Sequence, residues 1–336
     1  MTIFKRVQLT ALVAVLALSA APVAAQTIKI ATLSPEGSAW MKVLRKAGKA
    51  VETRTNGEVK FKFYPGGVMG DDKAVMRKMR VGQLHGAVVT SGGLVQAYPD
   101  IALYSMPMLF RNEAEIDHVR AALDDTLMAG LREEKFVGFG FAEVGFAYPM
   151  TQQPAASVAE MRQRKVWTPD NDQASLEGFK AFDISPIPLP IADVLAGLQT
   201  GLIDSIASPP IGTIALQWHT QVDYALELPL LYVYGLFAMA ERPFNRLSAE
   251  QQVIVSEEMG AAVREVDSAA RRDHENAKAA LVNQGIQWLQ PEAPATAEWL
   301  QLADAARNEM VAGDYISAAL YQQTLDLLAE FRAAGD

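Results

Sequence analysis

The feature that most constrains the fold is a unit that occurs twice, in which a helix ends at a glycine and a short apolar strand follows. The first copy has its glycine at Gly82 and ends its strand at Ser91, and the second has Gly201 and Ser208. Glycine commonly ends a helix because it adopts the left-handed conformation without steric cost. Ligands bind at strand ends in open α/β sheets, so the repeat predicts two similar lobes with strand ends facing across a cleft. The same unit also occurs in α/β proteins of other kinds.

The N-terminus has the pattern of a secretory signal peptide. Lys5 and Arg6 precede an apolar stretch over residues 9–18, and residues 23–25 are small side chains suited to cleavage. The apolar stretch is short for a membrane span, which makes a membrane anchor the weaker alternative. We therefore expect residues 1–25 to be removed and the mature chain to reside in the periplasm.

Composition limits the classes of function. The roughly 310 residues that remain after cleavage fit two domains. A formal charge of −9 and a sequence pI near 5.1 argue against nucleic acid as a partner. Since the chain has no cysteine, cysteine nucleophiles, zinc–thiolate sites and iron–sulfur clusters are excluded. A chain of this size can bury a sufficient core without disulfides.

Hydrophobic periodicity predicts an α/β fold with a mostly parallel sheet. Strands are expected at 27–32, 59–64, 83–91, 136–143, 165–169, 184–189, 202–208, 230–239 and 287–289, and helices at 39–55, 113–133, 172–181, 191–201, 295–310 and 316–332. Ser248 has the pattern of an N-cap for a helix that continues to about Asn283 and is long enough to span both lobes. We expect lobe I to comprise 26–145 plus about 230–265, and lobe II about 146–229 plus about 266–336, with the chain crossing near 145–155 and 225–240.

No catalytic constellation is apparent. No serine lies in a G-x-S-x-G elbow, the glycines near residue 140 do not have dinucleotide-loop spacing, and the four histidines lack metal-ligand spacing. The acidic pairs Asp71-Asp72 and Asp124-Asp125 lie at predicted helix ends, where capping in water accounts for them. The sequence therefore predicts no enzyme, no metal and no cofactor.

Several segments in a fixed order carry a family resemblance. They are residues 28–32, 64–67, 69–71, 79–84, 106–110 and 198–204. In this order the chain resembles the extracytoplasmic solute-binding subunit of TRAP transporters, of the DctP type, over nearly the whole mature sequence. The resemblance implies a periplasmic binding-protein fold of two lobes, joined by crossing strands and spanned by one long helix.

The resemblance also implies a function. A small organic solute is enclosed by hinge closure and delivered to the membrane permease subunits, with the binding protein acting as a monomer. The alternative is a periplasmic sensor or binding module of the same fold that is not coupled to transport.

The sequence departs from the family at the solute site. The family usually has an arginine in a Lys-Ile-Arg-Val-Pro pattern that pairs with a substrate carboxylate, and Trp167 stands there instead. A second arginine often follows the glycine that matches Gly145, where this chain has Phe146. Ser208 replaces a common asparagine. We therefore expect an apolar, aromatic and hydroxylic pocket and disfavour a simple dicarboxylate.

These arguments give a set of candidate ligand-binding residues: Trp40, Thr90, Ser91, Glu143, Gly145, Phe146, Tyr148, Trp167, Asp170, Ser208 and Tyr234. Trp167 is expected to set the substrate class, favouring a planar, apolar or cationic group. Replacing Trp167 with alanine should weaken binding by roughly 1–3 kcal/mol and affect stability less. The alternative is that Trp167 belongs to the core of a repacked lobe.

Overall fold

The computed structural model describes residues 25–170 and 173–335, so the predicted signal peptide falls almost wholly outside the described residues. The described chain forms a mixed eight-stranded sheet with the order β10-β8-β4-β9-β3-β1-β2, in which β7 also pairs with β4, and a separate parallel pair, β5-β6. The strands are β1 (Gln26–Thr32), β2 (Val59–Tyr64), β3 (Gly86–Thr90), β4 (Phe136–Thr151), β5 (Trp167–Pro169), β6 (Ile187–Leu189), β7 (Ser205–Ser208), β8 (Tyr224–Leu226), β9 (Leu231–Ala240) and β10 (Gln287–Leu289).

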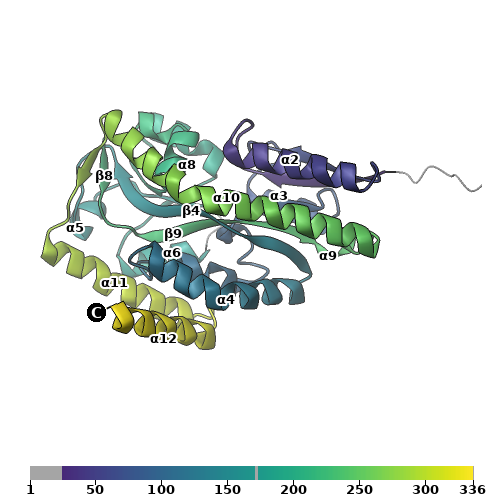
Figure 1. Cartoon of the computed structure of the whole chain (residues 1–336). Helices are drawn as coiled ribbons and strands as arrows, with labels where there is room; N and C mark the ends of the chain where they lie inside the picture. The colour runs from purple at the N-terminus through teal and green to yellow at the C-terminus, as the bar shows by residue number, and fades with distance from the viewer. Residues whose placement is uncertain (1–24, 171–172, 336) are drawn as a thin grey trace, which may run out of the picture.

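Helices cover both faces of this sheet (Figure 1). They are α2 (Ala39–Arg54), α3 (Asp72–Arg80), α4 (Glu113–Glu133), α5 (Val158–Met161), α6 (Gln173–Ala181), α7 (Val194–Gln199), α8 (Pro210–Ala215), α9 (Glu241–Phe244), α10 (Ala249–Asn283), α11 (Ala293–Ala312) and α12 (Ala318–Gly335). Short 3-10 turns are η1 (Ser91–Gly93), η2 (Pro99–Ser105), η3 (Ile191–Asp193) and η4 (Trp218–Thr220). The α/β class predicted from periodicity is confirmed. The prediction of a mostly parallel sheet is wrong, because β9 runs antiparallel to β3 and β4 runs antiparallel to β7, β8 and β9.

The predicted long helix is α10, and it has 35 residues. Ser248 caps it as predicted, because the Ser248 hydroxyl accepts from the backbone N–H of Gln251 and the Gln251 side chain accepts from the backbone N–H of Ser248. Figure 1 shows α10 lying across β4 and β9, with α2 and α8 on the same side of the sheet. This helix therefore packs along both halves of the molecule.

Strand β4 connects the two halves. Its first part, from Phe136 to Ala147, pairs with β9, and its last residues pair with β7 and β8. The pairing with β9 shifts register between Gly138 and Phe141 and again between Glu143 and Gly145, which is the signature of β-bulges. The strand extends eight residues beyond the predicted end at residue 143 because the apolar residues after Gly145 continue the ladder.

Both helix ends of the repeated unit form as predicted, but its strands begin three residues later than expected, as β3 and β7, and Ser91 lies in η1. A neighbouring strand is also shorter than expected. Gly82 has φ +74° and Gly201 has φ +69°, so both helices that precede these glycines end in left-handed residues. The strand predicted at 184–189 is reduced to β6. Prolines at 186, 188 and 190 have no backbone N–H to contribute, which limits the ladder to three residues.

The described apolar side chains pack into three clusters. One cluster lies between α2, α10 and the β1 side of the sheet, and it includes Ile28 and Met259. The largest surrounds η2, α4 and the β4–β9 pair, and it includes Tyr104 and Leu123. The third lies under α6 and α11 around Trp299. The largest cluster contains residues of both predicted lobes, such as Val75 and Trp218, so the apolar core is continuous across their junction.

Candidate ligand-binding site

A cavity of about 50 Å³ lies where the two predicted lobes meet. Its described lining residues come from the lobe I segments Leu33, Asp71, Asp72, Thr90 and Gly92 and from the lobe II segments Pro169, Asp170 and Ile191. We call it the interlobe pocket. Its walls are the ends of β1, β3 and β5 together with the starts of α3 and η3. Strand ends are where α/β sheets bind ligands.

On the lobe I side, the start of α3 packs against the end of β3. Asp71 is the N-cap of α3, and its carboxylate accepts from the backbone N–H of Ala74 at 2.7 Å. The next residue, Asp72, accepts a hydrogen bond from the Thr90 hydroxyl at 3.1 Å. A Cβ at Gly93 would lie 2.9 Å from Asp72 Oδ2, so only glycine allows this close approach. The contact holds Asp72 at the floor of the pocket.

The interlobe pocket is acidic. Burial raises the pKa of Asp72 to about 7, although the hydrogen bond from Thr90 acts in the opposite direction. Burial also raises the pKa of Asp170, and the neighbouring charge of Asp71 adds to this effect. Neither arginine nor lysine is present among the described residues that line the pocket. The wall therefore presents hydrogen-bond acceptors rather than a cationic clamp.

The raised pKa of Asp72 makes stability depend on pH. The folded state holds the Asp72 proton up to a pKa of about 7, above the ordinary value of 3.8, so it binds more protons than the unfolded chain between these values. The free energy of unfolding should therefore fall as pH rises from about 4 to about 7 and then level off. Asp72→Asn should flatten this part of the curve and raise the free energy of unfolding by about 1–3 kcal/mol above pH 7. Urea unfolding of both proteins across this pH range is the measurement, and identical slopes would contradict the assignment.

On the lobe II side, β5 delivers Pro169 and Asp170 to the pocket. Trp167 stands two residues earlier and is 6% exposed. Its indole N–H donates to the carbonyl oxygen of Leu189 at 2.9 Å, and its ring meets Trp218 edge-on with 5.2 Å between centroids. The single N–H of Trp167 is thus used within lobe II, and Trp167 is not among the described residues that line the interlobe pocket.

Two of the predicted site residues line the interlobe pocket, namely Thr90 and Asp170. Ser91 is buried next to Thr90, with its hydroxyl 3.1 Å from that of Ser105. Ser208 ends β7 opposite Tyr148, and its hydroxyl donates to the carbonyl oxygen of Pro209. The first strand of the repeat, β3, thus ends at the pocket. The second strand, β7, contributes no described lining residue, and the lobe II wall comes from the end of β5 and the start of η3.

The predicted residues Glu143, Phe146 and Tyr234 on the crossing strands are buried and are not among the described residues that line the interlobe pocket. Glu143 is 3% exposed and accepts from the Tyr232 hydroxyl at 3.1 Å. Phe146 meets the Tyr232 ring edge-on at 5.7 Å between centroids. The Tyr234 hydroxyl donates to the carbonyl oxygen of Ile101.

The remaining three predicted residues contact α10 or the crossing strands. Gly145 packs against the His274 ring of α10. The Tyr148 ring lies near both His274 and Trp288. Trp40 begins α2 and packs over Gly235 of β9. These contacts place Gly145, Tyr148 and Trp40 at the junction between lobes.

Sequence reasoning missed most of the pocket wall in both predicted lobes. Leu33, Gly92, Pro169 and Ile191 carry no local chemical signature. The Asp71-Asp72 pair was interpreted as capping in water, which holds for Asp71 as the N-cap. Asp72 instead turns toward Thr90, and the presence of two adjacent carboxylates was the available signal.

Two further observations on the described residues concern metal binding and membrane-spanning helices. No group of three or more histidine, aspartate and glutamate side chains in residues 25–170 and 173–335 is arranged to hold a metal ion. Within the same ranges, no helix combines the length and the hydropathy needed to cross a membrane.

Comparison with known proteins places the chain in a family. The sequence model of bacterial extracellular solute-binding protein family 7, DctP, matches residues 30–314. The 2,3-diketo-L-gulonate-binding periplasmic protein YiaO of Escherichia coli is 28% identical over 252 residues, which is 71% of this chain and 74% of that protein.

Solved structures show the same fold. The sugar acid binding protein DctPAm from Advenella mimigardefordensis, in complex with galactonate, has a TM-score of 0.83 at 17% identity and covers 91% of this chain and 99% of its own. A TRAP periplasmic solute binding protein from Desulfovibrio salexigens with bound orotic acid has a TM-score of 0.80 at 19% identity, covering 92% of this chain and 99% of its own. The chain therefore belongs to the DctP family of bacterial extracellular solute-binding proteins and is a TRAP-type periplasmic solute-binding protein.

Proposed function

We propose that the interlobe pocket captures a small organic solute and that the closed protein delivers it to TRAP membrane permease subunits. The observation that carries this proposal is the pocket itself, because its walls come from strand ends of both predicted lobes. A solute held between two lobes favours their closed arrangement, which is how binding proteins signal occupancy to a partner. We further propose that residues 1–25 are cleaved after export, that the mature protein is a monomer and that it returns the solute unchanged.

The lobe boundaries follow from the crossing strands. We propose that lobe I comprises 26–145 plus about 230–265, and lobe II about 146–229 plus about 266–336. Both β4 and β9 pass the junction side by side, paired from Phe136 to Ala147 on β4. A hinge at this junction absorbs closure in a few residues, and the bulge before Gly145 is a place where the ladder is already irregular.

The solute class follows from the charges of the pocket. We propose that Trp167 takes the place of the family's carboxylate-binding arginine and that no carboxylate clamp exists there. A solute carboxylate would meet the carboxyl groups of Asp72 and Asp170 with no lysine or arginine in the described lining, whereas hydroxyl and amine groups can donate to the carboxyl oxygens. The protein from Escherichia coli is named for a sugar acid, diketogulonate, and the solved relatives hold galactonate or orotic acid. We expect this chain to prefer a neutral or cationic solute with several donors.

A thermal-shift screen tests the proposed function. A solute that binds only the folded state raises the unfolding temperature, so a library of polyols, amines, zwitterions and sugar acids reports both binding and class. Hits should be neutral or cationic, and calorimetry with chromatography should recover them unchanged. If sugar acids were the only hits, the charge argument would be wrong while the binding function stood. If no solute in a broad library bound, the binding function itself would be in doubt.

Trp167 offers a separate test of specificity. Its burial means that alanine would remove packing as well as any solute contact, so Trp167→Phe is the sharper variant because it keeps a ring face. We expect Trp167→Phe to weaken binding of the screened solute by about 1 kcal/mol and Trp167→Ala by roughly 1–3 kcal/mol. Calorimetric affinity and the unfolding midpoint of the ligand-free protein are measured together. An unchanged affinity with a large fall in midpoint would show that Trp167 only packs lobe II.

A further inference from the structure

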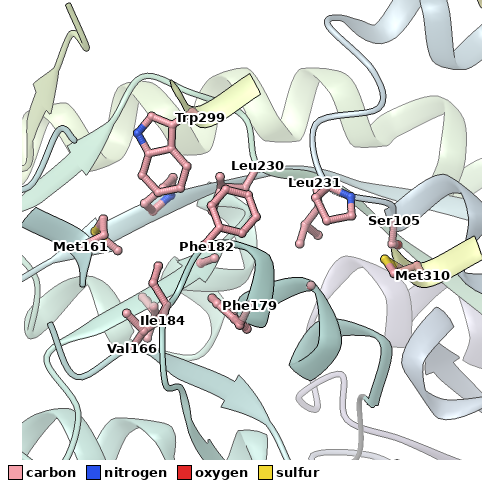
Figure 2. Close-up of a pocket in the computed structure, with 15 residues that line it drawn as sticks. Ser105, Met161, Val166, Phe179, Phe182, Ile184, Leu230, Leu231, Trp299 and Met310 are labelled. Carbon is pink, nitrogen blue, oxygen red and sulfur yellow. The ribbon is translucent and has the colours of Figure 1, made fainter. Parts of the chain in front are cut away.

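A second pocket lies between the sheet and helices α6 and α11, with a volume of about 70 Å³ (Figure 2). Most of its lining residues belong to the proposed lobe II, and Ser105, Pro107, Leu230 and Leu231 belong to lobe I. Figure 2 shows Met161 and Val166 at one end, Ser105 and Met310 at the other, and the Phe182 ring between them. We call it the lobe II pocket. It has no described lining residue in common with the interlobe pocket. The two are therefore separate cavities.

The wall of the lobe II pocket is almost entirely apolar. Aromatic rings of Phe182 and Trp299 lie 5.5 Å apart, between centroids, and methionine and aliphatic side chains complete the surface. The hydroxyl of Ser105 lies on the wall, but it donates to the carbonyl oxygen of Tyr232 at 2.8 Å and pairs with Ser91. The described wall presents no charged side chain. A charged molecule would lose its hydration here without compensation, so the occupant must be uncharged.

Two buried hydroxyls, those of Thr168 and Ser205, lie next to lining residues on neighbouring strands, although neither residue itself lines the pocket. Val166 lines the pocket, and Thr168, two residues further along the chain, points to the same face. Ser205 of β7 is bridged to Val166 and shares that face. Thr168 is 1% exposed and Ser205 is 0% exposed, and neither hydroxyl oxygen has a hydrogen-bond partner among the described residues. Buried hydroxyls normally have partners, so these two groups favour an occupant with a polar group.

We propose that the lobe II pocket is a second binding site, which takes an uncharged molecule with a small hydrocarbon body and one hydroxyl group. An apolar cavity of about 150 Å³ is known to hold benzene, so the smaller volume here fits a body of roughly three to five carbons. The hydrocarbon packs against Phe182 and Trp299, and the hydroxyl reaches Thr168 or Ser205. This site is independent of the transported solute.

Cyclopentanol and cyclopentane are matched probes for this site. In protein labelled at the methionine methyl groups, the Met161 and Met310 signals should shift saturably with cyclopentanol, because both side chains line the pocket. Met41 and Met259, in the lobe I core, are internal controls that should not shift. Cyclopentane should bind roughly 2- to 10-fold more weakly, the range expected for one lost hydrogen bond, and Thr168→Val should reduce the preference for the alcohol.

A filling variant with its own control completes the test. A Cβ at Gly178 of α6 would meet only the Pro107 ring, at 3.7 Å, so a side chain can be introduced there without a clash. Gly178→Leu should abolish the saturable shifts by occupying the pocket, and Gly178→Ala should preserve them. The proposal is overturned if Met161 and Met310 shift no more than Met41 and Met259, or if Gly178→Leu binds cyclopentanol as the parent protein does. Should the leucine variant not fold, equal binding of both probes in the parent protein and in Thr168→Val overturns the assigned polar contact.

Discussion

Replacing Arg120 with methionine should lower the free energy of unfolding by about 3–5 kcal/mol, the usual cost of removing one partner from a buried ionic network. The Arg120 side chain is 12% exposed. Its guanidinium lies 3.0 Å from the Asp267 carboxylate and 3.2 Å from that of Asp124, and it donates to the carbonyl oxygen of Phe141. Without Arg120, the partly buried carboxylates of Asp124 and Asp267 remain close to each other with no cation between them.

The network around Arg120 joins the elements that connect the lobes. Asp267 belongs to α10 and also accepts from the backbone N–H of Glu143 at 2.7 Å, beside the bulge in β4. Glu143 in turn lies 3.4 Å from the guanidinium of Arg271 on α10. Burial raises the pKa of both Glu143 and Asp124. Ion pairs and hydrogen bonds of Asp267 and Arg271 on α10 with Arg120 and Glu143 thus link the long helix to α4 and to strand β4.

Urea unfolding of Arg120→Met measures the effect, and Arg132→Met is the matched control. Arg132 lies on the same helix, α4, and is exposed. Its replacement should change the free energy of unfolding by about 0.5 kcal/mol or less. If Arg120→Met cost no more than the control, the network would contribute little, and the connection between α10 and β4 would depend on apolar packing alone.

The fold could be predicted because local patterns and family motifs agree. Alternation gave β2 at residues 59–64, the N-cap at Ser248 gave the start of α10, and the two glycines gave two helix ends. These features depend on residues close in sequence. The strand predicted at 184–189 was too long, because three prolines limit β6 in a way that hydrophobicity alone does not show.

The site was predicted only in part because its contacts join distant segments. Thr90 and Asp170 were found at strand ends, where position alone is informative. Asp72 looked like a capping residue, since nothing near it in the sequence shows that β3 brings Thr90 within 3.1 Å. Glu143 was predicted as a ligand-binding residue, and nothing near it in the sequence shows that its carboxylate is buried against Tyr232, 89 residues away. Burial of a charged group is a tertiary property, and a single sequence carries little signal for it.

The second large effect is expected at Gly145, where β4 passes the junction between lobes. Gly145 has φ +114°, a conformation that side chains rarely adopt. A Cβ there would lie 2.4 Å from Nδ1 of His274. His274 is 3% exposed on α10, and burial lowers its pKa, so the ring is packed in its neutral form. Gly145→Ala should therefore cost about 3–5 kcal/mol, combining backbone strain with overpacking.

A double-mutant cycle separates the two causes. His274→Ala removes the ring that the new methyl group would strike but leaves the backbone conformation, so Gly145→Ala should cost less in that background by about 1–3 kcal/mol. Gly201→Ala is the control for strain alone, because Gly201 has φ +69° and a Cβ there meets nothing within 4 Å. Urea unfolding of the single and double variants supplies the cycle. A Gly145→Ala cost equal to that of Gly201→Ala, with no coupling to His274, would show that α10 moves freely away from β4. In that case the contact between Gly145 and His274 would not fix the long helix to the crossing strand, and hinge closure would have to be controlled elsewhere.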